Sequence, residues 1–259
     1  MDGQIIKRRT PEEREVERKR EELAVLRSTL AERELELADM RSSLAVFEGR
    51  YLRQVGSLYA ELDEWKAHTR RLEAERHPSA AATARAEEAS EQARRAYSEA
   101  HGTASETKDF TPSPELRNLF REIAKRIHPD LARDSADEER RTRFMADANR
   151  AYQSGDSETL RRILTEFEDG SEVVVGDGIG AELIRLIRQI SLAKDRIVAI
   201  EGVLELLLKG EIAQLRKQSE AAEQVGRDLL AELADSVQRE IQNARDEYEK
   251  LAVQESSPA

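Results

Sequence analysis

The sequence has no cysteine, and only 4% of its residues are aromatic. The lack of cysteine excludes disulfides, thiol catalysis and thiolate metal sites, and it leads us to expect a reducing, cytoplasmic setting. No apolar run approaches the length of a bilayer span, and the first residues do not resemble a signal peptide, so we expect no membrane association. Few aromatics beside 37% charged residues predict long exposed helices rather than one large globular core.

Positive charge is also in deficit, because 53 acidic residues face 42 basic ones and give a net charge of −11. Binding to nucleic acid needs a surplus of Lys and Arg that neutralises phosphates. We therefore expect no nucleic-acid partner, although local basic patches are compatible with this balance.

Side chains that carry out catalysis or hold metals do not cluster in the sequence. None of the four histidines has a second His or a carboxylate at metal-ligand spacing. No serine lies in a nucleophile-elbow context. We accordingly predict no catalytic residues, no metal, no cofactor and no enzymatic activity.

Residues 1–76 carry apolar side chains in a heptad repeat, which predicts a coiled coil. After Leu58 the phase slips by one residue to Leu62 and Trp65, as in a stutter. The seam must be buried on a second copy of the chain, which would make a homo-oligomer, or on another helix of the same chain. One seam position holds Val16, Leu23, Leu30, Leu37, Leu44, Tyr51 and Leu58, and the other holds Leu26, Met40 and Phe47.

Residues 77–112 are rich in Ala, Ser and Glu, which predicts a linker that is helical in its Ala-rich part and builds no packed core. Residues 169–180 are rich in Gly but match no phosphate-binding fingerprint, so a second linker is expected there. Residues 181–253 return to heptads and predict a C-terminal coiled coil. Its two registers meet at Lys209-Gly210, where either a hairpin turns or one long helix continues, and we favour the hairpin.

Residues 113–168 begin with a basic amphipathic helix that runs into His128-Pro129-Asp130. Ser113 or Thr111 offers an N-cap, and Pro114 suits the first helical position. The helix must end before Pro129, because proline disfavours a helical residue in front of it.

Two further helices complete this segment. Ser135 to Glu138 reads as a capping box for a helix that stops at Gly155, and Asp156 can cap a short final helix. The first two helices should be antiparallel, with a small core between them. Its expected members are Leu116, Leu119, Phe120, Ile123, Ile127, Phe144, Ala148, Ala151 and Tyr152.

The basic helix, the His-Pro-Asp turn and the capped helix behind it together resemble the J domain of DnaJ-type co-chaperones. The resemblance covers about 113–152 and extends weakly to Phe167. In that family the first of these helices and the tripeptide dock on a DnaK-type chaperone and stimulate its ATP hydrolysis. The resemblance implies that His128, Pro129 and Asp130 form the activating loop. It also implies that Arg117, Arg121, Lys125 and Arg126 contact an acidic patch of the partner.

The local charge agrees with such a partner, since 115–133 holds five basic and three acidic residues. A patch of this kind favours encounter with an acidic protein surface. The segment departs from the family in three ways. No counterpart of the family's first short helix is recognisable, Glu122 interrupts the positive face, and Ile127 replaces the usual aromatic residue before the His. The coiled coils could pack where the missing helix would lie.

The sequence thus predicts an all-α protein, with long coiled-coil helices flanking a small J-domain-like helical hairpin. The leading hypothesis is a non-catalytic co-chaperone or adaptor that docks on a DnaK-type chaperone. The alternative is a structural coiled-coil scaffold whose J-like segment has lost the chaperone-stimulating activity.

Overall fold

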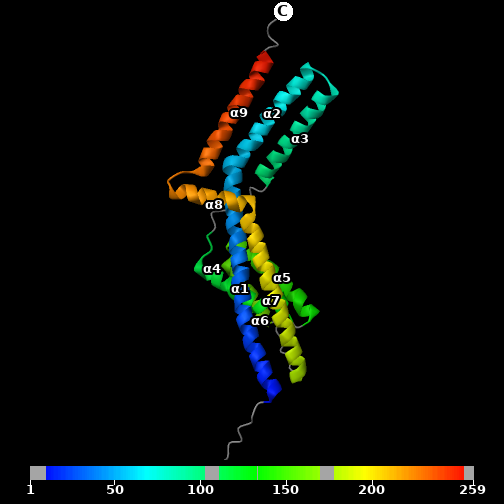
Figure 1. The fold of residues 1–259 in the computed structure, drawn as a ribbon, viewed down its shortest axis with the longest axis vertical. Helices are drawn as coiled ribbons and strands as arrows, with labels where there is room; N and C mark the ends of the chain where they lie inside the picture. Colours follow the sequence, from blue (N-terminus) through cyan, green and yellow to red (C-terminus); the bar gives the residue numbers. More distant parts are fainter. Residues whose placement is uncertain (1–9, 103–110, 133, 170–177, 254–259) are drawn as a thin grey trace, which may run out of the picture. The chain divides into compact units, whose positions relative to one another are not determined.

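The computed structural model describes residues 10–102, 111–132, 134–169 and 178–253. Every regular element in these ranges is a helix, which confirms the all-α class (Figure 1). Within the same ranges, no helix has both the length and the apolar character that crossing a membrane requires. Most of the predicted Gly-rich linker and the end of the predicted Ala-rich linker lie outside the described residues.

The chain divides into two compact units, each built from segments that are distant in the sequence. Unit 1 contains residues 1–43 and 110–209, and unit 2 contains residues 44–109 and 210–259. This division differs from the predicted one, in which the two ends of the chain formed separate coiled coils. Apolar seams from the two halves of the chain are instead buried on each other within each unit.

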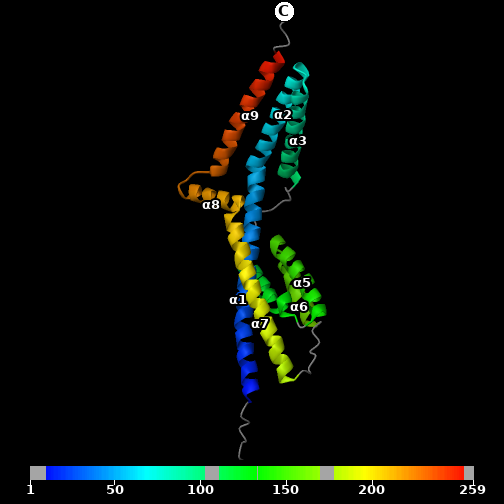
Figure 2. The ribbon, with the colours of Figure 1, turned by 45° about the vertical axis from the view of Figure 1, so that its right-hand side comes forward.

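In unit 1, helix α1 (Pro11–Tyr51) lies beside α7 (Ile179–Lys209) through its residues up to Ser43 (Figures 1 and 2). Ion pairs Arg20–Glu182 and Arg33–Glu201 show that the two helices run parallel. The heptads therefore bury their seam within the chain, which is one of the two alternatives that the sequence leaves open. The homo-oligomer stays a prediction, which light scattering on the full chain can test. The buried seam residues are Val16, Leu23, Leu30 and Leu37 on α1 and Leu186, Ile190, Ala193, Ile200 and Leu204 on α7.

The rest of unit 1 is a three-helix module made of α4 (Pro114–Ile127), α5 (Ser135–Ser154) and α6 (Ser157–Asp169). A short 3₁₀ turn, η2 (Pro129–Leu131), joins α4 to α5. The Ser113 side chain caps α4, as predicted, by accepting from the Leu116 amide. The cap of α5 is Asp134 rather than Ser135, and α5 ends at Gly155, whose φ of 74° suits glycine.

The core of the module contains side chains from its own three helices and from one face of α1. Phe120 of α4 lies 4.8 Å from Tyr152 of α5, measured between ring centroids, and the Arg141 guanidinium of α5 reaches the Arg126 carbonyl of α4. These two contacts show that α4 and α5 are antiparallel. The same cluster contains Ala31, Leu35 and Ala38 of α1. Helix α1 thus covers the module, in which no counterpart of the first short helix is recognisable in the sequence.

In unit 2, α2 (Ser57–Arg76) packs against both α3 (Ala80–Gly102) and α9 (Leu229–Val253). The prediction that 77–112 builds no packed core is wrong for α3, because Ala86 and Ala100 are buried. Because the alanine side chain is small, an alanine-rich helix can be buried by close approach of a second helix, without large apolar side chains. A π-helical turn, η1 (Leu52–Gly56), precedes α2 and adds one residue to a helical turn. It lies just before Leu58, after which the heptad phase slips.

The C-terminal heptads are interrupted at Gly210, whose backbone is extended between α7 and α8 (Glu211–Gln224). This break excludes one long helix through Lys209-Gly210. Helix α7 buries its apolar residues on α1 in unit 1, and α9 buries its own in unit 2. The tight turn lies later, between α8 and α9, where Gly226 has a φ of 75°.

Candidate functional site

The His-Pro-Asp turn holds itself together through the His128 ring. Helix α4 ends at Ile127, and the His128 Nδ1 atom accepts a hydrogen bond from the Asp130 amide at 3.1 Å. Because Nδ1 accepts, the ring hydrogen of a neutral imidazole lies on Nε2. Nε2 lies 3.0 Å from Oε1 of Glu34 on α1 and donates to it. His128 is only 2% exposed, so the imidazole is committed to contacts within the chain.

Glu34 is buried and lies at the centre of a polar cluster formed by α1, the turn and α7, whose Arg196 side chain is 42% exposed. The Oε1 atom of Glu34 also accepts from Arg196 Nε at 3.0 Å and from Nη2 at 2.8 Å. Burial pushes the pKa of Glu34 up, but the hydrogen bond from His128 and the charge of Arg196 outweigh it, so its pKa is lowered. The carboxylate is therefore ionised at neutral pH and paired on both sides.

Two further side chains fix the backbone of the turn. Arg141 of α5 donates to the Arg126 carbonyl at 2.8 Å, satisfying an oxygen that the end of α4 leaves free. Gln189 of α7 donates to the Leu131 carbonyl at 2.7 Å. Leu131 itself is buried among seam residues of α1 and α7. The turn is thus embedded in the flank of the α1–α7 pair.

The basic residues of α4 that precede the turn also meet acidic residues of α1. Arg117 Nε lies 3.0 Å from Asp39 Oδ2, and Arg121 forms an ion pair with Glu32 at 2.5 Å. Asp39 additionally accepts a hydrogen bond from the Tyr152 hydroxyl. Burial, followed by this contact with Asp39, raises the pKa of Tyr152. Asp39 therefore ties α1 to both α4 and α5.

The remaining predicted residues are accessible. Lys125 and Arg126 are exposed, and Arg126 pairs with Glu122 of its own helix at 3.1 Å. Pro129 and Asp130 are partly exposed. The structure thus separates the predicted residues into an α1-facing set, which is Arg117, Arg121 and His128, and an outward pair, which is Lys125 and Arg126.

The acidic partners of the α1-facing set were missed in the sequence, as were Arg141, Gln189 and Arg196. A signal for the covering face of α1 does exist. Ala31, Leu35 and Ala38 form a second stripe at four- and three-residue steps, beside the heptad seam, and acidic residues border it. Nothing in the sequence says that this stripe meets α4 rather than another helix.

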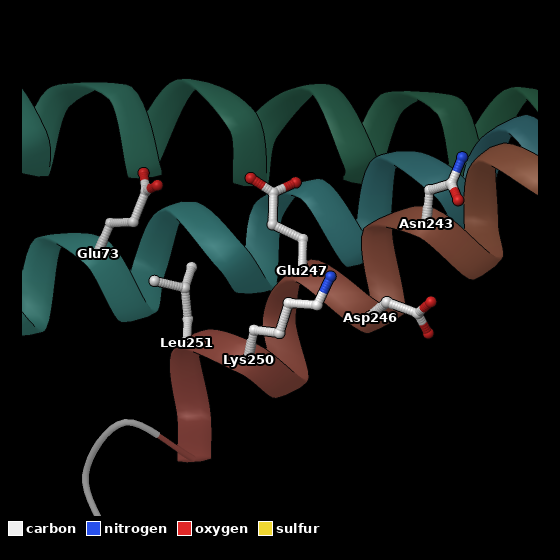
Figure 3. Close-up of a pocket in the computed structure, with 6 residues that line it drawn as sticks. All are labelled: Glu73, Asn243, Asp246, Glu247, Lys250 and Leu251. Carbon is white, nitrogen blue, oxygen red and sulfur yellow. The ribbon is translucent and has the colours of Figure 1, made fainter.

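A separate cleft in unit 2 lies where the end of α2 meets α9 (Figure 3). Glu73 projects from α2, and Asp246, Glu247 and Lys250 project from α9. Within the described residues, no group of three or more His, Cys, Asp and Glu side chains is placed to hold a metal ion. The cleft offers acidic surface but no built site.

No protein-family model, curated protein or solved structure matches this chain. The residues and geometry of the turn therefore carry the functional argument.

Proposed function

We propose that this protein is a non-catalytic, DnaJ-like co-chaperone or adaptor of the cytoplasm. It docks on a DnaK-type chaperone through α4 and the His128-Pro129-Asp130 turn, and it stimulates ATP hydrolysis by that chaperone. The main support is the geometry of the turn, which connects two antiparallel helices and is closed by the His128 ring itself.

The charge of α4 supports the same proposal. Lys125 and Arg126 lie exposed on the last turn of α4, next to the tripeptide. Exposed cations beside a docking loop attract an acidic protein surface over a distance of several ångströms and raise the association rate. Binding that begins in this way weakens as salt is added.

ATP turnover by a DnaK-type chaperone tests this function directly. We expect the full chain to raise the turnover rate at low salt and saturating concentration. His128→Gln should abolish the increase, because glutamine cannot reproduce both ring contacts. The control is His68→Gln, which changes a histidine of unit 2 outside the turn. Absence of stimulation by the wild type, even at low salt, would contradict the proposal.

A second candidate function is a structural scaffold, in which the turn only anchors the module to the α1–α7 pair. The burial of His128 against Glu34 favours it, because a docking residue is ordinarily accessible. In a scaffold, His128→Gln lowers the stability of unit 1 and changes no chaperone activity. Binding to the chaperone without stimulation of ATP hydrolysis, or no binding, would favour the scaffold.

A further inference from the structure

We infer that α1 occupies the docking surface of α4 as a built-in acidic competitor, so that an acidic partner binds the α1-facing set only after α1 has left it. This inference rests on the proposed function and adds how access to the turn is controlled. It concerns residues 31–39 of α1, which we call the cover segment.

The cover segment is chemically complementary to the α1-facing set. Each member of the α1-facing set contacts one carboxylate of the cover segment, as Arg117 meets Asp39, Arg121 meets Glu32 and His128 meets Glu34. An acidic partner surface would present the same groups to the same side chains. Two ligands that need the same donors cannot bind together, so the cover segment and the partner exclude each other.

The contacts of the cover segment with the α1-facing set are uneven in strength. The Arg117 and Arg121 side chains are 50% and 35% exposed, and exposed ion pairs contribute little because water screens them. Only Glu34 is buried with its partner, at 6% against 3% exposure for His128. The apolar part of the cover is a short stripe of small side chains, Ala31, Leu35 and Ala38. Two weak pairs, one buried pair and this stripe cost less to release than a continuous interface of large apolar side chains would.

The outward pair lies in an exposed position. Lys125 and Arg126 are accessible while the cover segment is in place. A partner can therefore make its first contact there and then compete with α1 for Arg121 and His128. The apparent affinity of such a site is lowered by the fraction of molecules in which it is open.

The experiment compares two triple variants of the full chain in binding to a DnaK-type chaperone. Glu32→Gln/Glu34→Gln/Asp39→Asn, the cover variant, removes the three carboxylates that contact the α1-facing set and keeps the shape of each side chain. Glu17→Gln/Glu21→Gln/Glu36→Gln, the control variant, removes three exposed or partly exposed charges from the same helix. Glu17 and Glu36 pair with arginines of α1 itself. Circular dichroism is the check that both variants remain helical.

We expect the cover variant to lower the apparent Kd by about tenfold or more, because a larger fraction of molecules is open, and the control variant to leave it unchanged. Equal binding by wild type, cover variant and control would overturn the competition and leave the proposed function standing. No binding by any of the three would overturn both.

A second measurement keeps the test independent of how well the cover variant folds. Hydrogen exchange on the wild type, with and without the chaperone, follows the amides of residues 31–39. We expect these amides to exchange faster when the chaperone is bound, because α1 loses its contact with α4. Unchanged or slower exchange there in the bound state would overturn the inference.

Discussion

The two units join their helices by different means. In unit 2, α3 lies against α2 with small residues such as Ala86 buried between them, and ion pairs such as Arg245–Glu61 lie on partly exposed side chains. In unit 1, α1 meets α4 through carboxylates that contact Arg117, Arg121 and His128, beside a small apolar stripe. Polar contacts between α2 and α3 in unit 2, such as Gln92 with Asp63, lie on exposed side chains beside the packed helices. The joint in unit 1 places polar groups where apolar ones would hold as well, which fits a surface with a second use.

The largest effect should follow from removing the core of the module. Phe120 is fully buried and packs against Tyr152, so Phe120→Ala leaves a cavity and loses apolar contact. We expect a loss of about 3–5 kcal/mol in the free energy of unfolding of the module. Hydrogen exchange of peptides from 111–169 measures it, and exchange of the α2 and α3 peptides should stay unchanged. A similar increase in hydrogen exchange in both units would contradict the expectation that the two units unfold independently.

Removing the buried carboxylate should have the next largest effect. Glu34→Ala leaves His128 and Arg196 without their acceptor, and we expect a cost of about 2–4 kcal/mol in unit 1. The control is Glu36→Ala, which removes an exposed carboxylate paired with Arg33 and should cost less than about 1 kcal/mol. Equal losses of unfolding free energy for the two variants would show that burial of Glu34 does not increase its contribution to stability.

Acid should remove the contribution of Glu34. Its pKa lies below the ordinary value of 4.5, because His128 and Arg196 outweigh the opposing effect of burial. A carboxylate with a lowered pKa stabilises the folded state above its unfolded pKa and loses that contribution as the pH falls through its folded pKa. The stability difference between wild type and Glu34→Gln should therefore shrink below about pH 4.5. Urea unfolding at a series of pH values measures it, and a difference that grows in acid is the contrary result.

A smaller effect is expected where alanine allows close packing in unit 2. Ala86→Leu adds a branched side chain to a buried position between α3 and α2. We expect a cost of about 1–3 kcal/mol from overpacking, seen as faster hydrogen exchange in α2 and α3 alone. The matched control is Ala84→Leu, which makes the same change at an exposed position of α3 and should be neutral. Equal effects of the two changes would show that Ala86 does not lie at the packed interface between α2 and α3.

Local features of the fold were predictable because they depend on neighbouring residues. The proline at 129 ends α4, Gly155 ends α5, and the heptads mark the buried seams of α1 and α7. Helix α3 was predicted as helical, but its packing was not, since alanine-rich faces carry little hydrophobic signal. The choice between an intrachain partner and a second copy was also open, because a heptad seam does not identify what covers it.

The candidate site was predictable in its chemistry but not in its accessibility. The tripeptide and the four basic residues follow from the sequence and its resemblance. Burial of His128 depends on Glu34, which is 94 residues away in the chain, and on Arg196, which contacts that carboxylate from α7. Such contacts arise from tertiary packing, and a helix with many acidic residues gives no sign of which carboxylate will be buried.

The contact between Glu34 and His128 joins α1 to the His-Pro-Asp turn, and a double-mutant cycle measures it most directly. The cycle compares the unfolding free energies of wild type, Glu34→Ala, His128→Ala and the double variant. We predict a coupling energy above about 1 kcal/mol at neutral pH, because the two side chains share a buried hydrogen bond. A coupling energy near zero would contradict the claim that α1 holds the turn.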